Sequence, residues 1–164
     1  MKWIKKIVCL MTVAALALTG CGDSGEGGSN VDVSALGGEL SALDTELPSM
    51  ETVTNTSENA ETAFAVLADY DYAKIDSFYY AYSASGSPEE IAVISVKEKN
   101  DVADLMKALQ NHLDSRRQTF QAYDPDQVSM VDNAIITYQG KVLLYACSKK
   151  NGVMQDKFKE KVAA

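Results

Sequence analysis

The segment from residue 75 to residue 97 reads IDSFYYAYSASGSPEEIAVISVK, and it decides the fold prediction. Its two ends, residues 75–83 and 90–97, are rich in aromatic and β-branched residues, which favour strands. The run Ala84-Ser85-Gly86-Ser87-Pro88 between them is typical of a turn. The segment therefore predicts two antiparallel strands joined by a short loop.

A second pair of strands is expected near the C-terminus. Residues 134–138 and 142–147 are mainly apolar, and Gln139-Gly140-Lys141 separates them. A glycine in this position can adopt the positive φ that a tight hairpin needs. The sequence thus predicts four strands.

Helices are expected around these strands. The clearest begins after Asp101, a capping residue, and runs to about Tyr123 with its apolar residues on one stripe. Similar spacing predicts helices over residues 32–47, over residues 61–68 and from about Asn151 onward.

Two stretches of the N-terminal third carry weaker signals. Gly37-Gly38 lies inside the first expected helix and lowers its propensity by about 2 kcal/mol relative to two alanines. Met50 to Asn59 is interpreted as a polar linker. The order of elements predicts an α+β fold, with an antiparallel four-stranded sheet and helices packed mainly on one face. The other face would be solvated and would be the natural binding surface.

The N-terminus has the layout of a lipoprotein signal peptide. Met1 to Lys6 carries three lysines and no acid, and Ile7 to Leu18 contains no charged residue. The run ends at Leu18-Thr19-Gly20-Cys21, which resembles the lipobox of bacterial lipoproteins. We expect cleavage between Gly20 and Cys21 and acylation of the Cys21 sulfur. An ordinary signal peptide with an unmodified cysteine is the alternative.

This processing predicts three parts and a location. Residues 1–20 are the signal peptide, residues 21–30 are a lipidated flexible tether, and residues 31–164 form a single α+β domain. The partner of Cys21 is the lipid bilayer, because two acyl chains bind a membrane stably where one is marginal. The expected location is the outer face of the cytoplasmic membrane.

Cysteine use fits this interpretation. Cys9 leaves with the signal peptide and Cys21 is acylated, so Cys147 is the only thiol of the expected mature chain. An intramolecular disulfide is then impossible. Because Cys147 ends an apolar run, it is expected to be a small buried hydrophobe rather than a nucleophile.

The charge is unevenly distributed. Residues 22–73 contain eleven acids and neither Lys nor Arg, whereas residues 74–164 contain twelve acids and twelve bases. The net charge of the whole chain is −8. An acidic chain without basic clusters does not attract phosphates, so we expect no nucleic-acid partner.

No catalytic signature is present in the sequence. It contains no serine-hydrolase elbow, phosphate-binding loop, zinc-protease motif or calcium-loop spacing, and we assign no catalytic residue, cofactor or metal. His112 is the only histidine, and its place at the edge of the apolar stripe predicts a half-exposed helix residue. The pairs Glu89/Glu90 and Asp124/Asp126 are interpreted as solvated turn acids and a helix cap rather than as a glycosidase pair.

Arg116 is one candidate ligand residue. It lies inside the apolar face of the 101–123 helix, so its guanidinium must reach solvent or meet a carboxylate. With Tyr123 it would form an anion site for a carboxylate or a phosphate. The plainer alternative places the Arg116 stem over Phe120 and its head in water.

Tyr80 and Tyr82 are the other candidates. They share one face of the 75–83 strand with Phe78. Such a row could stack on sugar rings or on a protein partner. The plainer alternative is that this face fills the core, and burial of the row against the 101–123 helix would exclude the stacking platform.

Three stretches together resemble a known family. They are Glu90 to Ile94, Gln118 to Val128 with its Tyr-x-Pro motif, and Asn133 to Ile136. Over about Asp32 to Phe158 the chain is similar to the bacterial lipoproteins of domain of unknown function 4358. That family has no assigned activity, so the resemblance implies a lipoprotein with this domain and transfers no catalytic residue.

These observations favour a non-catalytic binding or interaction module of the cell envelope. Its partner would be an envelope protein, a wall polymer or a small anion. A cell-envelope hydrolase that uses carboxylate or tyrosine residues is the alternative, and a deep pocket lined by carboxylates of raised pKa would favour it. A structural part of an envelope assembly is a third interpretation, which a large exposed apolar patch would favour.

Overall fold

The computed structural model describes residues 31–163. The expected signal peptide, the lipidation and cleavage site at Gly20 and Cys21, and the tether lie outside the described residues. Within the described part, no helix has the length and apolar character that crossing a membrane requires. The elements follow in the order α1 (Val33–Ser41), β1 (Met50–Thr54), α2 (Ala60–Leu67), η1 (Tyr72–Lys74), β2 (Ile75–Ser83), β3 (Glu90–Val96), η2 (Lys99–Asp101), α3 (Val102–Tyr123), η3 (Pro125–Gln127), α4 (Val128–Asp132), β4 (Ile135–Gln139), β5 (Val142–Cys147) and α5 (Asn151–Val162).

The strands form one antiparallel sheet in the order β1-β2-β3-β5-β4. The α+β class and the four expected strands are confirmed, but the sheet has five strands. The added strand, β1, arises from the segment that was interpreted as a polar linker. Only Val53 of β1 is buried, because an edge strand has few neighbours. Its sequence therefore carries little apolar signal.

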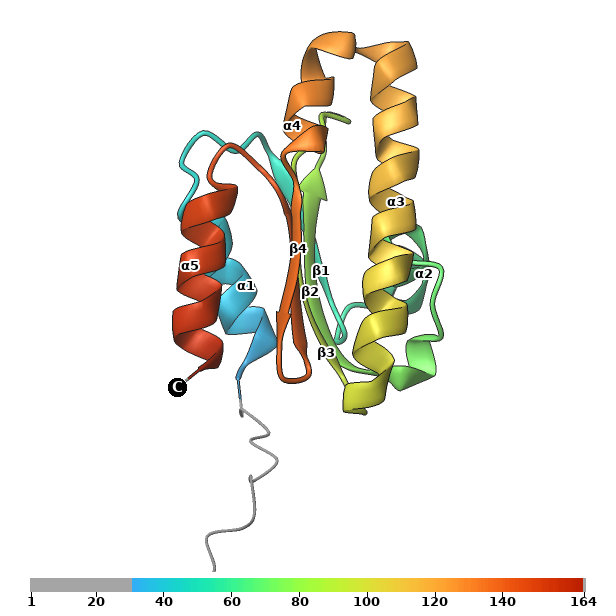
Figure 1. Cartoon of the computed structure of the whole chain (residues 1–164), viewed down its shortest axis with the longest axis vertical. Helices are drawn as coiled ribbons and strands as arrows, with labels where there is room; N and C mark the ends of the chain where they lie inside the picture. The colour runs from blue at the N-terminus through green and yellow to red at the C-terminus, as the bar shows by residue number, and fades with distance from the viewer. Residues whose placement is uncertain (1–30, 164) are drawn as a thin grey trace, which may run out of the picture.

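Helices cover both faces of the sheet, so the prediction of helices mainly on one face is wrong (Figure 1). α2 and α3 lie on one side, and α1 and α5 lie on the other. The central strands explain this arrangement, since every residue of β5 and all of β3 except Ser95 are buried. Strands buried on both faces carry continuous apolar runs. The expected solvated face is therefore absent over these strands.

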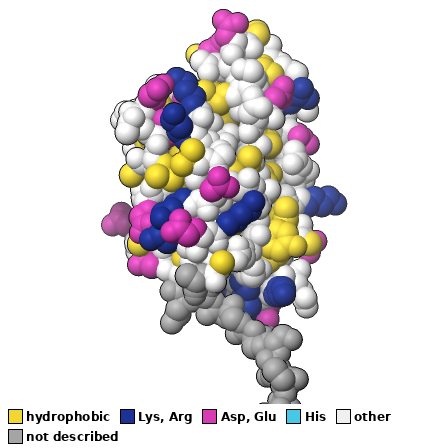
Figure 2. Space-filling view, turned by 60° about the vertical axis from the view of Figure 1, so that its left-hand side comes forward, with side chains coloured by type: hydrophobic (Ala, Val, Ile, Leu, Met, Phe, Trp, Pro, Cys, Tyr) yellow, Lys and Arg dark blue, Asp and Glu magenta, His cyan; other side chains and the backbone are white. Residues whose placement is uncertain are grey.

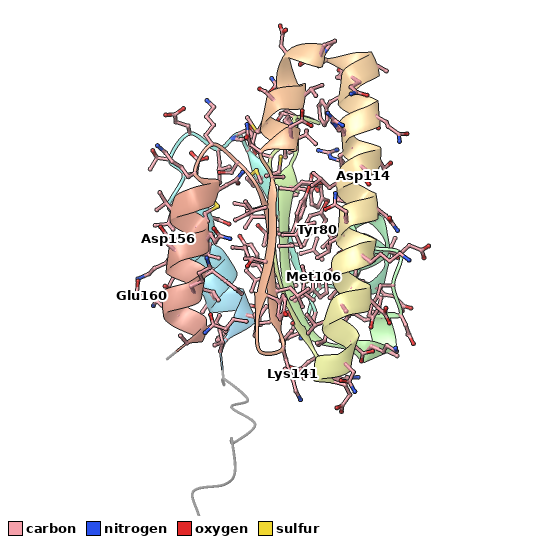
Figure 3. The ribbon with its side chains drawn as sticks, viewed as in Figure 1. Tyr80, Met106, Asp114, Lys141, Asp156 and Glu160 are labelled. Atoms are coloured by element: carbon pink, nitrogen blue, oxygen red, sulfur yellow. The ribbon has the colours of Figure 1, made fainter. Side chains whose placement is uncertain are left out.

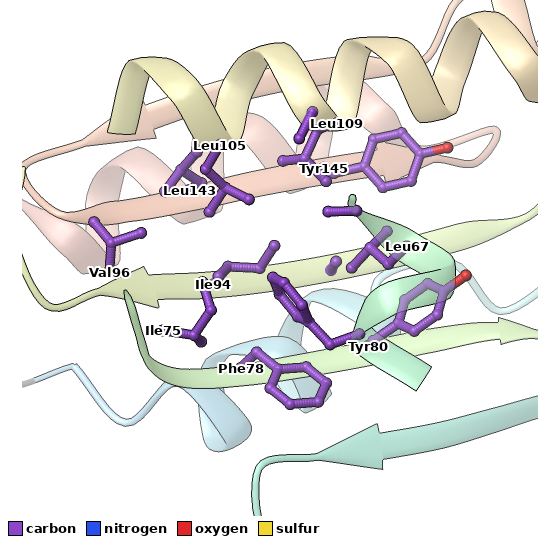
Figure 4. Close-up of a cluster of buried hydrophobic side chains, with 14 of the residues drawn as sticks. Leu67, Ile75, Phe78, Tyr80, Ile94, Val96, Leu105, Leu109, Leu143 and Tyr145 are labelled. Carbon is purple, nitrogen blue, oxygen red and sulfur yellow. The ribbon is translucent and has the colours of Figure 1, made fainter. Parts of the chain in front are cut away.

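Two cores result, one on each side of the sheet. The core under α2 and α3 includes Phe64, Phe78 and Leu109, and Figure 4 shows part of it. The core under α1 and α5 includes Tyr79 and Phe158. Neighbouring strand residues alternate between these cores, as the pleat of a strand requires.

Local signals at the element ends were mostly correct. Asp32 caps α1 by accepting a hydrogen bond from the Ala35 amide at 3.0 Å, and Gly140 has a φ of 61° in the hairpin turn. α1, however, ends at Ser41 rather than at residue 47. Asp101 makes no capping bond with its side chain, because its carboxylate pairs with Lys74 Nζ at 2.8 Å.

Candidate functional site

A row of paired residues across the sheet brings two tyrosines together. Tyr80 on β2 and Tyr145 on β5 both lie opposite Ala92 on β3. The small side chain of Ala92 leaves room for both rings, and Figure 4 shows their hydroxyl groups directed toward the same end of the sheet. Glu90 lies two residues before Ala92 on β3, on the same face of the strand. The hydroxyls are thus directed toward Glu90.

Both tyrosines donate hydrogen bonds to the Glu90 carboxylate. The Tyr80 hydroxyl lies 2.8 Å from Oε1, and the Tyr145 hydroxyl lies 2.9 Å from Oε2. These bonds join three neighbouring strands through one side chain.

α3 adds a hydrogen-bonding histidine and a positively charged arginine to the same carboxylate. His112 and Arg116 are four residues apart, so they lie on the same side of the helix. His112 Nε2 is 2.9 Å from Glu90 Oε2, and Arg116 Nε is 3.5 Å from the same oxygen. Arg116 also donates to the Ser87 carbonyl at 3.1 Å, and its guanidinium lies 4.9 Å from the centre of the Phe120 ring. We call these five side chains the Glu90 cluster: Tyr80, Glu90, His112, Arg116 and Tyr145.

Glu90 is held in its charged form. Only 3% of the residue is exposed, and burial alone would raise the pKa of its carboxyl group. The hydrogen bond and charge of His112, the charge of Arg116 and the bond from Tyr80 oppose this, and together they hold the pKa of Glu90 below its usual value. Burial, followed by the charge of Glu90, raises the pKa of both Tyr80 and Tyr145. The cluster therefore combines a carboxylate with two neutral phenols at neutral pH.

The cluster is a poor source of general base or nucleophile. Both oxygens of Glu90 already accept hydrogen bonds, and the tyrosine hydroxyls do not ionise easily. Its clear physical effect is to fix α3 against the sheet through charge-assisted bonds.

A cavity of about 250 Å³ lies beside the cluster, between α2 and β2. We call it the tyrosine cavity, and its lining residues are Asn59, Thr62, Ala63, Val66, Tyr80 and Tyr82. The two tyrosine rings lie 5.1 Å apart with an angle of 36° between their planes. Tyr80 belongs to both features, because its ring lines the cavity and its hydroxyl binds Glu90; Figure 3 shows it on the side of the sheet that faces α3.

The comparisons with known proteins place the chain in a family. The family model described as Domain of unknown function (DUF4358) matches residues 50–148. The chain belongs to this family. The resemblance to this domain family is thereby confirmed over a shorter range than Asp32 to Phe158, and the lipoprotein nature that it implied stays a prediction. No curated protein and no solved structure gives a significant match.

The DUF4358 match covers the whole candidate site. It begins at β1 and ends just after β5, so all residues of the Glu90 cluster and the tyrosine cavity lie inside it. α1 and α5, which cover the opposite face, lie outside the matched range.

The structure separates some of the expected site residues of this DUF4358 domain. Arg116 was expected either to reach solvent or to meet a carboxylate, and it meets the carboxylate of Glu90. Its guanidinium also lies over the ring of Phe120. Tyr123 lies two turns farther along α3 and is 80% exposed, so it does not join Arg116 in the cluster. Phe78 and Tyr80 are buried in the core. The row of aromatic residues is therefore no exposed stacking platform, although Tyr82 at its end remains half-buried beside the cavity.

Two interpretations of polar residues were wrong. Glu90 is a buried ion-pair partner, not a solvated turn acid, and His112 is 11% exposed rather than half-exposed. One signal could have found this: Glu90 shares its strand face with the apolar residues Ala92 and Ile94. A carboxylate on that face needs donors, and His112 with Arg116 is the only His/Arg pair spaced by four residues in the sequence.

Two other buried reactive groups, Cys147 and Asp44, are engaged in packing and hydrogen bonding. Cys147 is buried, as expected, and burial followed by the nearby charge of Glu90 raises the pKa of its thiol to about 12. Asp44, the other buried carboxylate among the described residues, accepts a bond from Ser148 Oγ at 2.8 Å and joins the segment after α1 to the start of α5. Within residues 31–163, no group of three His, Cys, Asp or Glu side chains could hold a metal ion.

Proposed function

We propose that the protein is a membrane-anchored extracytoplasmic lipoprotein whose domain is a non-catalytic binding module of the cell envelope. The observation that carries the binding role is the tyrosine cavity, one wall of which, Tyr80, is held in place by its bond to Glu90. Ligand sites are concave, mostly apolar and largely preformed, and this cavity has those properties.

The geometry of the cluster favours binding over hydrolysis. A hydrolase based on carboxylates needs an acid of raised pKa or a free base, whereas Glu90 has a lowered pKa and occupied oxygens. The raised pKa of Tyr80 likewise opposes a tyrosine nucleophile. The cluster instead fixes α3 against the sheet and holds Tyr80 at the cavity.

The surface over α1 and α5 has the character of a solvent-exposed surface rather than of a contact within an assembly. Figure 2 shows acidic and basic side chains intermixed there, with apolar side chains in separate small groups. Ion pairs Lys161–Glu39, at 2.8 Å, and Lys149–Glu46, at 3.0 Å, lie on this side. A structural assembly role would favour a continuous apolar patch, so it has less support.

The position of Val31 supports an orientation relative to the membrane. The described chain begins at the end of the domain opposite the α3–η3–α4 turn (Figure 1). A tether from Cys21 would therefore leave Tyr123, near that turn, among the residues farthest from the bilayer.

The anchor is tested by Cys21→Ala in intact cells. We expect the unmodified chain to keep its signal peptide or to leave the membrane fraction, because the acyl acceptor is lost. The measurement is membrane fractionation with intact mass, and Cys147→Ala is the matched control, which should fractionate as the wild type does. If Cys21→Ala fractionates unchanged and keeps the wild-type mass, the lipoprotein proposal is wrong.

The binding role is tested by photo-cross-linking from two exposed valines on opposite faces. Val66, at the rim of the tyrosine cavity, is 67% exposed, and Val153 on α5 is 53% exposed. A photoreactive amino acid at Val66 should give a discrete adduct in intact cells that mass spectrometry identifies, and the same group at Val153 should give none. Equal patterns at both positions would contradict a binding site at the cavity.

A further inference from the structure

We propose that the tyrosine cavity binds a small organic cation, with a primary or quaternary ammonium group on an apolar body. This inference rests on the proposed binding function and names the ligand class of the same site.

The two aromatic walls suit a cation. Ammonium groups bind to the faces of aromatic rings through the ring quadrupole. Tyr80 donates its hydroxyl proton to Glu90 at 2.8 Å, and Tyr82 donates its own to Glu51 at 2.6 Å. A phenol that donates to a carboxylate becomes more electron-rich, so both rings attract a cation more strongly than free tyrosines would. The two ring centres are 5.1 Å apart with 36° between the planes, so the rings pack against each other. Tyr80 is 2% exposed, so the half-buried Tyr82 supplies most of the aromatic surface that a ligand in the cavity can reach.

The surrounding charge also favours a cation. The wall opposite the tyrosines comes from α2 and the residue before it, and α2 carries Glu61 and no Lys or Arg. Glu51 lies at the tyrosine end through its bond to Tyr82, and the exposed Glu58 directly precedes the lining residue Asn59. The positive charge of Arg116, which also acts on Tyr80, is paired with Glu90. The potential at the rim is therefore negative.

The polarity of the walls argues against a sugar, a small anion or a polymer as the ligand. Ala63 and Val66 offer only apolar surface, and Asn59 and Thr62 are the only polar lining residues besides the tyrosines. A sugar ring would leave several hydroxyl groups without partners. A small anion would face Glu51 across the rim. A volume of about 250 Å³ suits a group of the size of choline rather than a polymer.

The inference is tested by titrating the purified chain with choline and with 3,3-dimethylbutan-1-ol, its uncharged isostere. The readout is the NMR shifts of ¹³C-labelled tyrosine rings, assigned with Tyr80→Phe and Tyr82→Phe. We expect choline to shift the Tyr80 and Tyr82 signals and to bind about 3- to 30-fold more tightly than the isostere, as a cation–π contact of about 0.5–2 kcal/mol predicts. Butyrate should give no shift.

Variants locate the effect at the cavity. Tyr82→Leu should weaken choline binding about 10-fold or more, and Glu51→Gln should weaken it about 3-fold while keeping both rings. Tyr138→Leu, an exposed tyrosine on the opposite edge strand β4, is the matched control and should bind as the wild type does. Glu51 is exposed, so Glu51→Gln keeps the test valid if Tyr82→Leu fails to fold.

Each other outcome overturns the inference in a recognisable way. Equal affinity for choline and its isostere would show that the site does not select a positive charge. The proposed binding function would then still stand. A preference for butyrate would show that the site binds an anion instead, and the proposed binding function would again still stand. If no probe shifts Tyr80 or Tyr82, the cation site is wrong, and the cross-linking from Val66 still decides separately whether the face binds anything.

Discussion

Replacement of Glu90 by alanine is expected to lower the free energy of unfolding by about 3–5 kcal/mol. The substitution removes the acceptor that Tyr80, Tyr145 and His112 share, and the carboxylate that pairs with the charge of Arg116. These donors would remain in a buried site without a partner, and the cost of such unpaired polar groups exceeds the mean value of the bonds themselves. Chemical denaturation in urea at neutral pH measures the loss.

The matched control is Glu98→Ala. Glu98 follows the far end of β3, is exposed, and takes part in no ion pair among the described residues. Its substitution should change the free energy of unfolding by less than about 0.5 kcal/mol. A similarly small effect at Glu90 would show that the cluster does not hold α3 to the sheet.

Acid should reduce the contribution of Glu90. Because the pKa of Glu90 is lower in the folded protein than in the unfolded chain, its contribution to stability is complete above the unfolded value of about 4.3. The contribution is lost as the pH falls from that value through the folded pKa. The difference in unfolding free energy between the wild type and Glu90→Ala should therefore shrink below about pH 4.3, and a difference independent of pH would contradict a charged Glu90.

Much of the fold could be predicted because its signals are local. The strands at 75–83 and 142–147 and the helix ending near Tyr123 have strong patterns of their own, and the structure places them where the sequence does. β1 was missed because an edge strand buries one side chain, Val53. Coverage of both sheet faces was missed although Ile91 to Ile94 of β3 is a continuous apolar run, which a sheet with one solvated face would not favour.

The candidate site was less predictable because it depends on strand register. The sequence predicts that Arg116 must reach solvent or meet a carboxylate, and it offers many acids as partners. Only the pairing of Ala92 with both Tyr80 and Tyr145 identifies Glu90 as the partner. The expected link between Arg116 and Tyr123 followed the helix period, which cannot show that α3 continues past the sheet and leaves Tyr123 exposed.

The two neighbouring glycines of α1 are expected to respond to alanine in opposite directions. Gly37→Ala should lower the free energy of unfolding by about 3 kcal/mol or more, because a Cβ at Gly37 would overlap the Cβ and ring of Tyr79 on β2. Tyr79 cannot easily move, since it is buried and its hydroxyl is 3.0 Å from Ser41 Oγ. α1 would have to shift away from the sheet and open the core that it shares with α5.

Gly38→Ala is the matched control within the same helix. A Cβ at Gly38 meets no atom within 4 Å, so the substitution should stabilise the domain by about 0.5–1 kcal/mol through helix propensity. Thermal and urea unfolding of both variants measure the pair. Equal effects would mean that the glycines act only through propensity. Opposite effects would mean that the two glycines have different roles. Gly37 is required for the close approach of α1 to Tyr79, whereas Gly38 only lowers the helix propensity of α1.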